Sequence, residues 1–96
     1  QITGVRLKNA ATGEKQEIVC DGIFVSVGRE PETRMIENQV VLDENGYIIA
    51  DESTKTNLPG VFAVGDIRTK ALRQIVTATA DGANAAYAVE EYLANK

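Results

Sequence analysis

The residues best suited to chemistry stand at the end of a short apolar run. Residues 61–64 are apolar, and Gly65 and Asp66 follow them directly. Such a run between turn residues predicts a buried strand, and open α/β sheets bind ligands beyond the carboxyl ends of their strands. Gly65 would let a bulky ligand approach the backbone, and Asp66 would accept hydrogen bonds from sugar or polyol hydroxyls. A plainer role for Asp66, capping a turn or a helix, stays open.

Three segments of the chain resemble the flavoprotein disulfide reductases with two dinucleotide-binding domains. Thr56 together with residues 61–66 resembles their second FAD fingerprint, in which the acid binds the ribityl chain and the threonine helps to hold the preceding loop. Residues 73–78 and Gly82 resemble the segment that low-molecular-weight thioredoxin reductases place against the flavin ring. Residues 21–31 resemble the crossover between the NADPH and FAD domains in the same proteins. The three motifs have the family's order and spacing, and the resemblance covers the whole chain.

This resemblance implies an α/β fold, namely the C-terminal part of a two-domain flavoprotein. Residues 1–29 would be the last strands of the NADPH-binding domain. Residues 30–96 would close the FAD-binding domain with a partial sheet, a hairpin and a C-terminal helix. In such an enzyme NADPH reduces FAD, FAD reduces a Cys-x-x-Cys disulfide, and the resulting dithiol reduces thioredoxin. The FAD-binding residues implied for this chain are Gly65, Asp66, Arg73, Gln74 and Ile75.

Several parts of such an enzyme do not occur in this sequence. There is no Gly-x-Gly-x-x-Gly turn for a pyrophosphate, and the one cysteine, Cys20, forms no Cys-x-x-Cys motif. The chain also opens with Gln1, within an expected strand. We therefore expect a fragment of a longer reductase that is inactive when isolated, with no catalytic residue of its own. Two alternatives remain: part of a thioredoxin-reductase-like ferredoxin–NADP reductase, or a non-catalytic piece that only self-associates.

Composition and charge limit the binding partners and the cellular location that we expect for this chain. The chain is 44% hydrophobic and 25% charged, which is ordinary for a globular protein. Its net charge of -4, without a basic cluster, argues against nucleic-acid binding. No apolar stretch approaches the roughly 20 residues of a membrane span, and no signal-peptide pattern opens the chain. A single unpaired cysteine is typical of a reducing compartment, so we expect a cytoplasmic protein.

The first half of the chain is expected to be mostly extended. Residues 2–8 and 16–20 predict two strands joined by a turn, and alternation in the first predicts one buried face. Residues 23–27 are apolar without alternation, which is typical of a strand covered on both faces. Residues 32–37 predict a short helix. Two apolar runs, 40–42 and 47–49, flank an Asn-Gly pair, the strongest short signal for a hairpin.

A helix is predicted from about Arg73 to Leu93. Its expected inward face consists of Ile75, Thr79, Gly82, Ala86, Val89 and Leu93. Gly82 and the small residues near it predict a close approach to a sheet or a ring system, although a local helix irregularity would also explain the glycine. The resemblance implies that the first helical amides, around Gln74 and Ile75, face the pyrimidine end of the isoalloxazine ring. Arg73 would either add positive charge there or be an ordinary surface arginine.

The chain is also expected to form a homo-oligomer. Residues 23–27 and 61–64 both predict strands covered on two faces, yet the sheets that would flank them are not in the sequence. Exposed apolar strands and open edges favour pairing with another chain.

Overall fold

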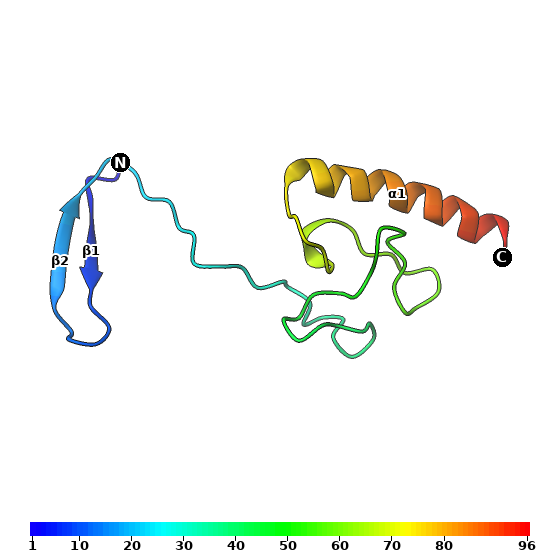
Figure 1. Cartoon of the computed structure of the whole chain (residues 1–96), viewed down its shortest axis with the longest axis horizontal. Helices are drawn as coiled ribbons and strands as arrows, with labels where there is room; N and C mark the ends of the chain where they lie inside the picture. The colour runs from blue at the N-terminus through cyan, green and yellow to red at the C-terminus, as the bar shows by residue number, and fades with distance from the viewer.

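The computed structural model describes all 96 residues and shows an elongated molecule with two unequal parts (Figure 1). Its principal extents are 62 × 27 × 21 Å. A hairpin at the N-terminus is followed by an extended linker, residues 21–30, and then by the C-terminal lobe, residues 31–96.

The N-terminal hairpin consists of β1 (Gly4–Lys8) and β2 (Lys15–Val19), which pair antiparallel. The predicted strands are confirmed to within two residues at each end. The predicted buried face is wrong, because only Val5 in these strands is even half-buried. Two strands alone form a single layer, and no other element covers either of its faces (Figure 1).

The strand predicted within the linker is not formed. Residues 23–27 form no strand, and their apolar side chains are exposed, Phe24 completely so. A strand covered on both faces needs neighbouring strands and a covering layer, and no segment of this chain pairs with these residues. Their apolar pattern is therefore not matched by any packing within the chain.

The C-terminal lobe contains a small apolar core formed by Val40, Ile48, Ala50 and Ala63. The predicted hairpin is confirmed, although its ladder is short. Leu42 and Ile48 form an antiparallel bridge, and the Asp43 side chain accepts hydrogen bonds from the amides that follow it in the turn. Gly46 has a φ of 85°, which explains the glycine at this position.

The partial sheet expected in this lobe is not continuous. Residues 61–64 are extended but form a single bridge, between Lys55 and Phe62, and Val61 and Val64 are exposed. Ile48 also pairs with Arg68 in a parallel bridge. Residues 32–37, predicted as a short helix, form turns instead. These segments lack the neighbouring strands that would extend each bridge into a ladder.

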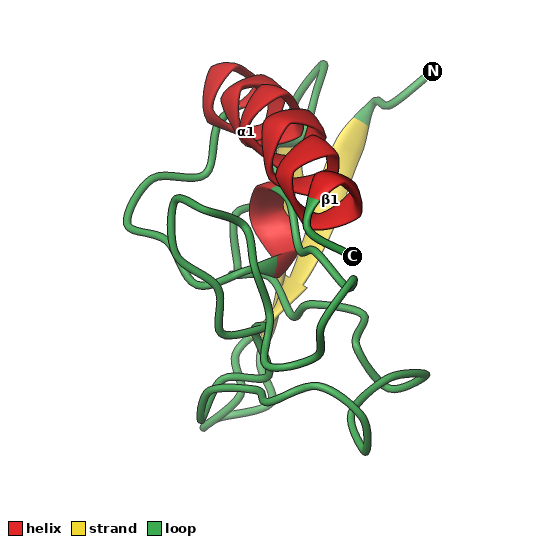
Figure 2. Cartoon of the chain, turned by 90° about the vertical axis from the view of Figure 1, so that its right-hand side faces the viewer, coloured by secondary structure: helices red, strands yellow, loops and turns green.

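Helix α1 (Ile75–Ala94) lies along one side of the lobe, across its loops (Figure 2). It begins two residues later than predicted, because Gln74 is its N-cap and Thr77 accepts a hydrogen bond from the Gln74 amide at 3.0 Å. The predicted inward face is wrong, since Ile75, Leu93 and their row are exposed. The residues that face the lobe are Thr77, Ala78, Asp81, Ala85, Ala88 and Tyr92.

Gly82 lies on the outer side of α1, and a Cβ at this position would meet nothing within 4 Å. The close approach predicted there is therefore not made by any part of this chain. The apolar row that includes Ile75 and Leu93 has no covering element either.

Candidate functional site

Gly65 and Asp66 form a sharp turn beneath the first turns of α1. They begin the short 3-10 helix η1 (Gly65–Ile67), which follows extended backbone at Val64. Gly65 is buried and has a φ of 74°, a conformation that side-chain-bearing residues rarely adopt. A Cβ on Gly65 would lie 3.5 Å from the Cβ of Ala78. The glycine thus satisfies both a backbone requirement and a close contact with the helix.

The side chain and the backbone of Asp66 have different partners. Its carboxylate is 44% exposed and lies 3.2 Å from the guanidinium of Arg29, at the end of the linker. Its carbonyl oxygen accepts a hydrogen bond of 3.1 Å from Nε of Arg73. The carboxylate therefore remains available to accept hydrogen bonds from a ligand, while the backbone is held by the lobe.

An open hollow of about 570 Å³ brings the expected site residues together. It is lined by Arg29, Asp66, Arg73, Gln74, Ile75 and Ala78. Four of the five residues expected from the sequence line it, and Gly65 lies directly before Asp66. The hollow therefore combines an acidic side chain with the N-terminus of α1, where unpaired amides and a partial positive charge are found.

Arg73 is held firmly within the lobe. It is half-buried, and its guanidinium lies 3.8 Å from the ring centre of Tyr47. Besides its bond to Asp66, it donates to the carbonyl oxygen of Arg68 at 3.1 Å. Arg73 is therefore partly covered by the lobe, and its positive charge lies at the wall of the hollow.

A buried ionic cluster lies behind the turn, and sequence reasoning did not identify it. We call Gly65, Arg68, Lys70 and Asp81 the Asp81 cluster. Asp81 accepts two hydrogen bonds from Arg68, both of 2.7 Å, one from Lys70 at 2.8 Å, and one from the Gly65 amide at 2.8 Å. The side chains of Arg68 and Asp81 are each 2% exposed. The sequence contains one feature that points to Asp81, because it is the only charged residue between Arg73 and Glu90.

The two main charges of the cluster stabilise each other. Hydrogen bonds from Arg68 hold the pKa of Asp81 well below its usual range, with smaller contributions from Lys70 and the Gly65 amide. The same contact raises the pKa of Arg68. Arg68 also donates to the carbonyl oxygens of Ala50 and Thr69 and to the exposed carboxylate of Glu52. Both charges are therefore compensated, as buried charges must be.

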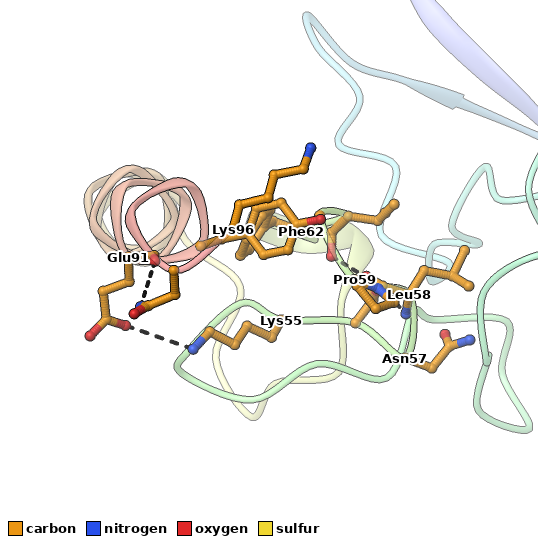
Figure 3. Close-up of a pocket in the computed structure, with 12 residues that line it drawn as sticks. Lys55, Asn57, Leu58, Pro59, Phe62, Glu91 and Lys96 are labelled. Atoms are coloured by element: carbon orange, nitrogen blue, oxygen red, sulfur yellow. Dashed lines mark hydrogen bonds and ion pairs between the residues drawn. The ribbon is translucent and has the colours of Figure 1, made fainter.

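A second hollow, of about 550 Å³, lies at the other end of α1 (Figure 3). Phe62 and Tyr92 meet edge to face there, with ring centres 6.3 Å apart, and Lys55 pairs with Glu91 at 3.7 Å. Thr56 belongs to the loop at this end and donates to the carbonyl oxygen of Val61 at 2.9 Å. This bond supports the loop-holding role that the resemblance implies for Thr56. None of the five expected FAD-binding residues lines this hollow.

A comparison with protein families shows which family this chain belongs to. Residues 1–82 match the model of the pyridine nucleotide-disulphide oxidoreductase family. The chain belongs to this family. It is 52% identical over 92 residues to a thioredoxin reductase of Peptoclostridium litorale, in an alignment that covers 90% of this chain. It is 44% identical over 93 residues to that of Listeria monocytogenes, covering 97% of this chain.

Solved structures of oxidoreductases agree with this assignment. The thioredoxin reductase of Streptococcus pyogenes superposes with a TM-score of 0.81 at 40% identity, and that of Lactococcus lactis with 0.75 at 42%. Each alignment covers 98% of this chain and 31% of the other. The two relatives named above are likewise covered over 29% of their length. The chain thus spans somewhat less than a third of the length of each of these four relatives. No helix of the structure has both the length and the apolar character needed to cross a membrane.

Proposed function

We propose that this chain supplies the part of an FAD site that contacts the ribityl chain and the isoalloxazine ring, within an NADPH-dependent thioredoxin reductase. The observation that carries the proposal is the convergence of Asp66 and the N-terminus of α1 on one hollow. The similarity to thioredoxin reductases along nearly the whole chain supports it.

The residues around the hollow fit FAD chemically. The hollow's size is within the range of about 300–1,000 Å³ for small-molecule sites. A half-exposed carboxylate suits the hydroxyls of a ribityl chain, because an ionised acid only accepts hydrogen bonds. Gly65 leaves the backbone beside Asp66 without a side chain, which allows a large cofactor to come close. The Arg29 guanidinium now beside Asp66 is exposed, so it can yield this position to a hydroxyl.

Residues at the start of α1 would act on the ring. Bound FAD supplies the hydride chemistry, and the protein tunes it by orientation and charge. The amides following Gln74 and the partial positive charge of the helix N-terminus would stabilise negative charge on the ring of a bound flavin. Arg73 adds a full positive charge at the same wall, held in place by Tyr47 and two carbonyl oxygens. Gln74 contributes through its backbone.

The two parts of the chain would belong to different domains of the enzyme. Residues 1–29 would complete the NADPH-binding domain and residues 30–96 the FAD-binding domain, with thioredoxin as the electron acceptor. The extended linker between them favours this division, and Gly28 has a φ of 98° with open space around it. Such a position can absorb the backbone rotation of a domain hinge.

The test is the substitution Asp66→Ala in the full-length reductase that contains this chain. A charged acceptor bonded to a hydroxyl contributes about 1.5–3 kcal/mol, so we expect FAD to bind about tenfold more weakly or worse. Titration of the FAD-free protein with FAD, followed by flavin fluorescence, measures this directly. Glu91→Ala, at the other end of α1, is the matched control and should bind FAD normally. Unchanged FAD affinity in the Asp66→Ala protein would refute the assignment.

A further inference from the structure

Asp66 lies between two residues that are both bound to Asp81. The amide of Gly65, directly before it, donates to Oδ2 of Asp81. The guanidinium of Arg68, two residues after it, makes the bidentate contact with the same carboxylate. Asp81 does not line the hollow. The residues on both sides of Asp66, which is expected to bind the ribityl chain, are therefore held by one residue of α1 that does not itself line the hollow.

The same helix also defines the other half of the site. Asp81 lies within α1 (Ile75–Ala94), and Ile75 and Ala78 at the start of this helix line the same hollow as Asp66. Arg73, just before the helix, completes the connection by donating to the carbonyl oxygens of Asp66 and Arg68. A displacement of the turn relative to Asp81 would thus change the separation between the acidic acceptor and the helix N-terminus.

Charge and burial make this attachment specific to a carboxylate. The four hydrogen bonds to Asp81 come from two cations and one amide, and the side chains of Asp81, Arg68 and Lys70 are 2–6% exposed. A neutral amide at this position would offer one acceptor atom and would place an N–H group against these donors. Lys70 would then lose its carboxylate partner, and Arg68 would keep only the exposed carboxylate of Glu52.

We propose that Asp81 is a positioning residue of the flavin site, which sets the distance between Asp66 and the N-terminus of α1 through Gly65 and Arg68. This inference rests on the proposed function, because it assumes that FAD binds between these two groups. Its effect on FAD passes through Asp66, so removing Asp66 should remove most of the effect of Asp81. A purely structural role predicts no such dependence.

The experiment is a double-mutant cycle in the full-length reductase with Asp66→Ala, Asp81→Asn and the double variant. FAD-free protein is titrated with FAD at a temperature where circular dichroism shows each variant folded, and the visible absorption spectrum of bound FAD is recorded. We expect Asp81→Asn alone to weaken FAD binding by about tenfold and to shift the flavin absorption bands. In the Asp66→Ala background, the same substitution should weaken binding by no more than about twofold to threefold. Glu91→Gln, an exposed acid on the same helix, is the control.

The outcomes separate the two hypotheses. If Asp66→Ala leaves FAD binding unchanged, the proposed function fails. If Asp66→Ala weakens binding but Asp81→Asn does not, or if the two effects multiply fully, the positioning role is overturned and the site remains. Should Asp81→Asn not fold, Lys70→Met takes its place in the cycle, because it removes one of the four hydrogen bonds and leaves Arg68 in contact with Asp81. A smaller weakening that again disappears in the Asp66→Ala background supports the proposal, and a fully multiplicative one overturns it.

Discussion

The two parts of the molecule differ in which side chains they bury. No residue in the first 30 is buried, although the hairpin and linker carry large apolar residues such as Val19 and Phe24. All ten buried residues of the chain belong to the C-terminal lobe, and its largest fully buried side chains are polar: Arg68, Thr54 and Asp81. Apolar residues alone therefore do not determine which part is well packed.

The difference shows what a short chain needs in order to form a lobe. The apolar core of the lobe has only four buried residues, and the Asp81 cluster joins three separate segments around it. The N-terminal hairpin has apolar residues but no second layer to bury them, and a two-stranded hairpin alone is marginally stable in water. We infer that the cluster makes a large contribution to the order of the lobe, as the following comparisons test.

The largest difference in stability should come from removing the arginine of one ion pair in each part of the molecule. Arg68 pairs with Asp81 at 2% exposure of both side chains, whereas Arg6 pairs with Glu17 at 70%. Arg68→Met leaves a buried carboxylate short of a partner and should cost about 3–5 kcal/mol. Arg6→Met removes an exposed pair and should cost less than about 1 kcal/mol. Denaturant unfolding followed by the helical circular dichroism signal compares their effects on the lobe, and equal midpoints would contradict the comparison.

Acid should weaken the lobe through the same cluster. The folded-state pKa of Asp81 is lowered, chiefly by Arg68. Its stabilising contribution is therefore complete above the unfolded-state pKa of about 3.9 and is lost as the pH falls below that value towards the folded-state pKa. We expect the unfolding free energy to fall steeply below about pH 4 and much less steeply in Asp81→Asn. Exposed Glu32 and Asp51 also have lowered pKa values, but they are present in both the unaltered chain and Asp81→Asn. Parallel pH profiles of the two proteins would therefore exclude Asp81 as the source of the acid sensitivity.

Two glycines with the same positive φ angle give a finer test. Gly65 and Gly13 both have a φ of 74°, and an alanine at either should cost about 1–2 kcal/mol locally. Gly65→Ala also brings a methyl group to Ala78 and strains the turn bound to Asp81, so it should lower the stability of the lobe. Gly13→Ala affects only the N-terminal hairpin, and the unfolding midpoint of the lobe should not change. A shift of that midpoint in Gly13→Ala would show that the two parts unfold together.

The sequence predicted the local elements better than the packing. Both hairpins and the C-terminal helix are confirmed, because turn chemistry and helix capping act over a few residues. Asp66, Arg73, Gln74 and Ile75 line one hollow, and their role in binding FAD stays a prediction.

Packing was harder to predict because it depends on what covers each face. Hydrophobic periodicity assigned the apolar row of α1 to the inside, yet the lobe packs against the row of small residues that contains Asp81. The apolar patterns of residues 23–27 and 61–64 predicted covered strands, for which this chain has no covering layer. The Asp81 cluster escaped detection because its contacts join residues up to 16 positions apart, a relation that periodicity does not record.

The smallest effect on the lobe should come from deleting residues 1–29, the part that we propose belongs to the NADPH-binding domain. A single hydrogen-bonded ion pair, between Arg29 and Asp66, joins these residues to the lobe, and the Arg29 side chain is 80% exposed. A chain of residues 30–96 should therefore keep its helical signal and lose less than about 1 kcal/mol of unfolding free energy.

The same deletion should change self-association much more than stability. It removes the exposed apolar segment 23–27, which we expect to bring copies of the 96-residue chain together. Sedimentation over a concentration series should show oligomers for the full chain and fewer for residues 30–96. Phe24→Ser in the full chain is the matched control, because it lowers the apolar exposure and keeps every residue of the hairpin. Equal association of the full and shortened chains would indicate that copies meet through the exposed row of α1 instead. A marked loss of stability in residues 30–96 would show that the lobe depends on the first 29 residues.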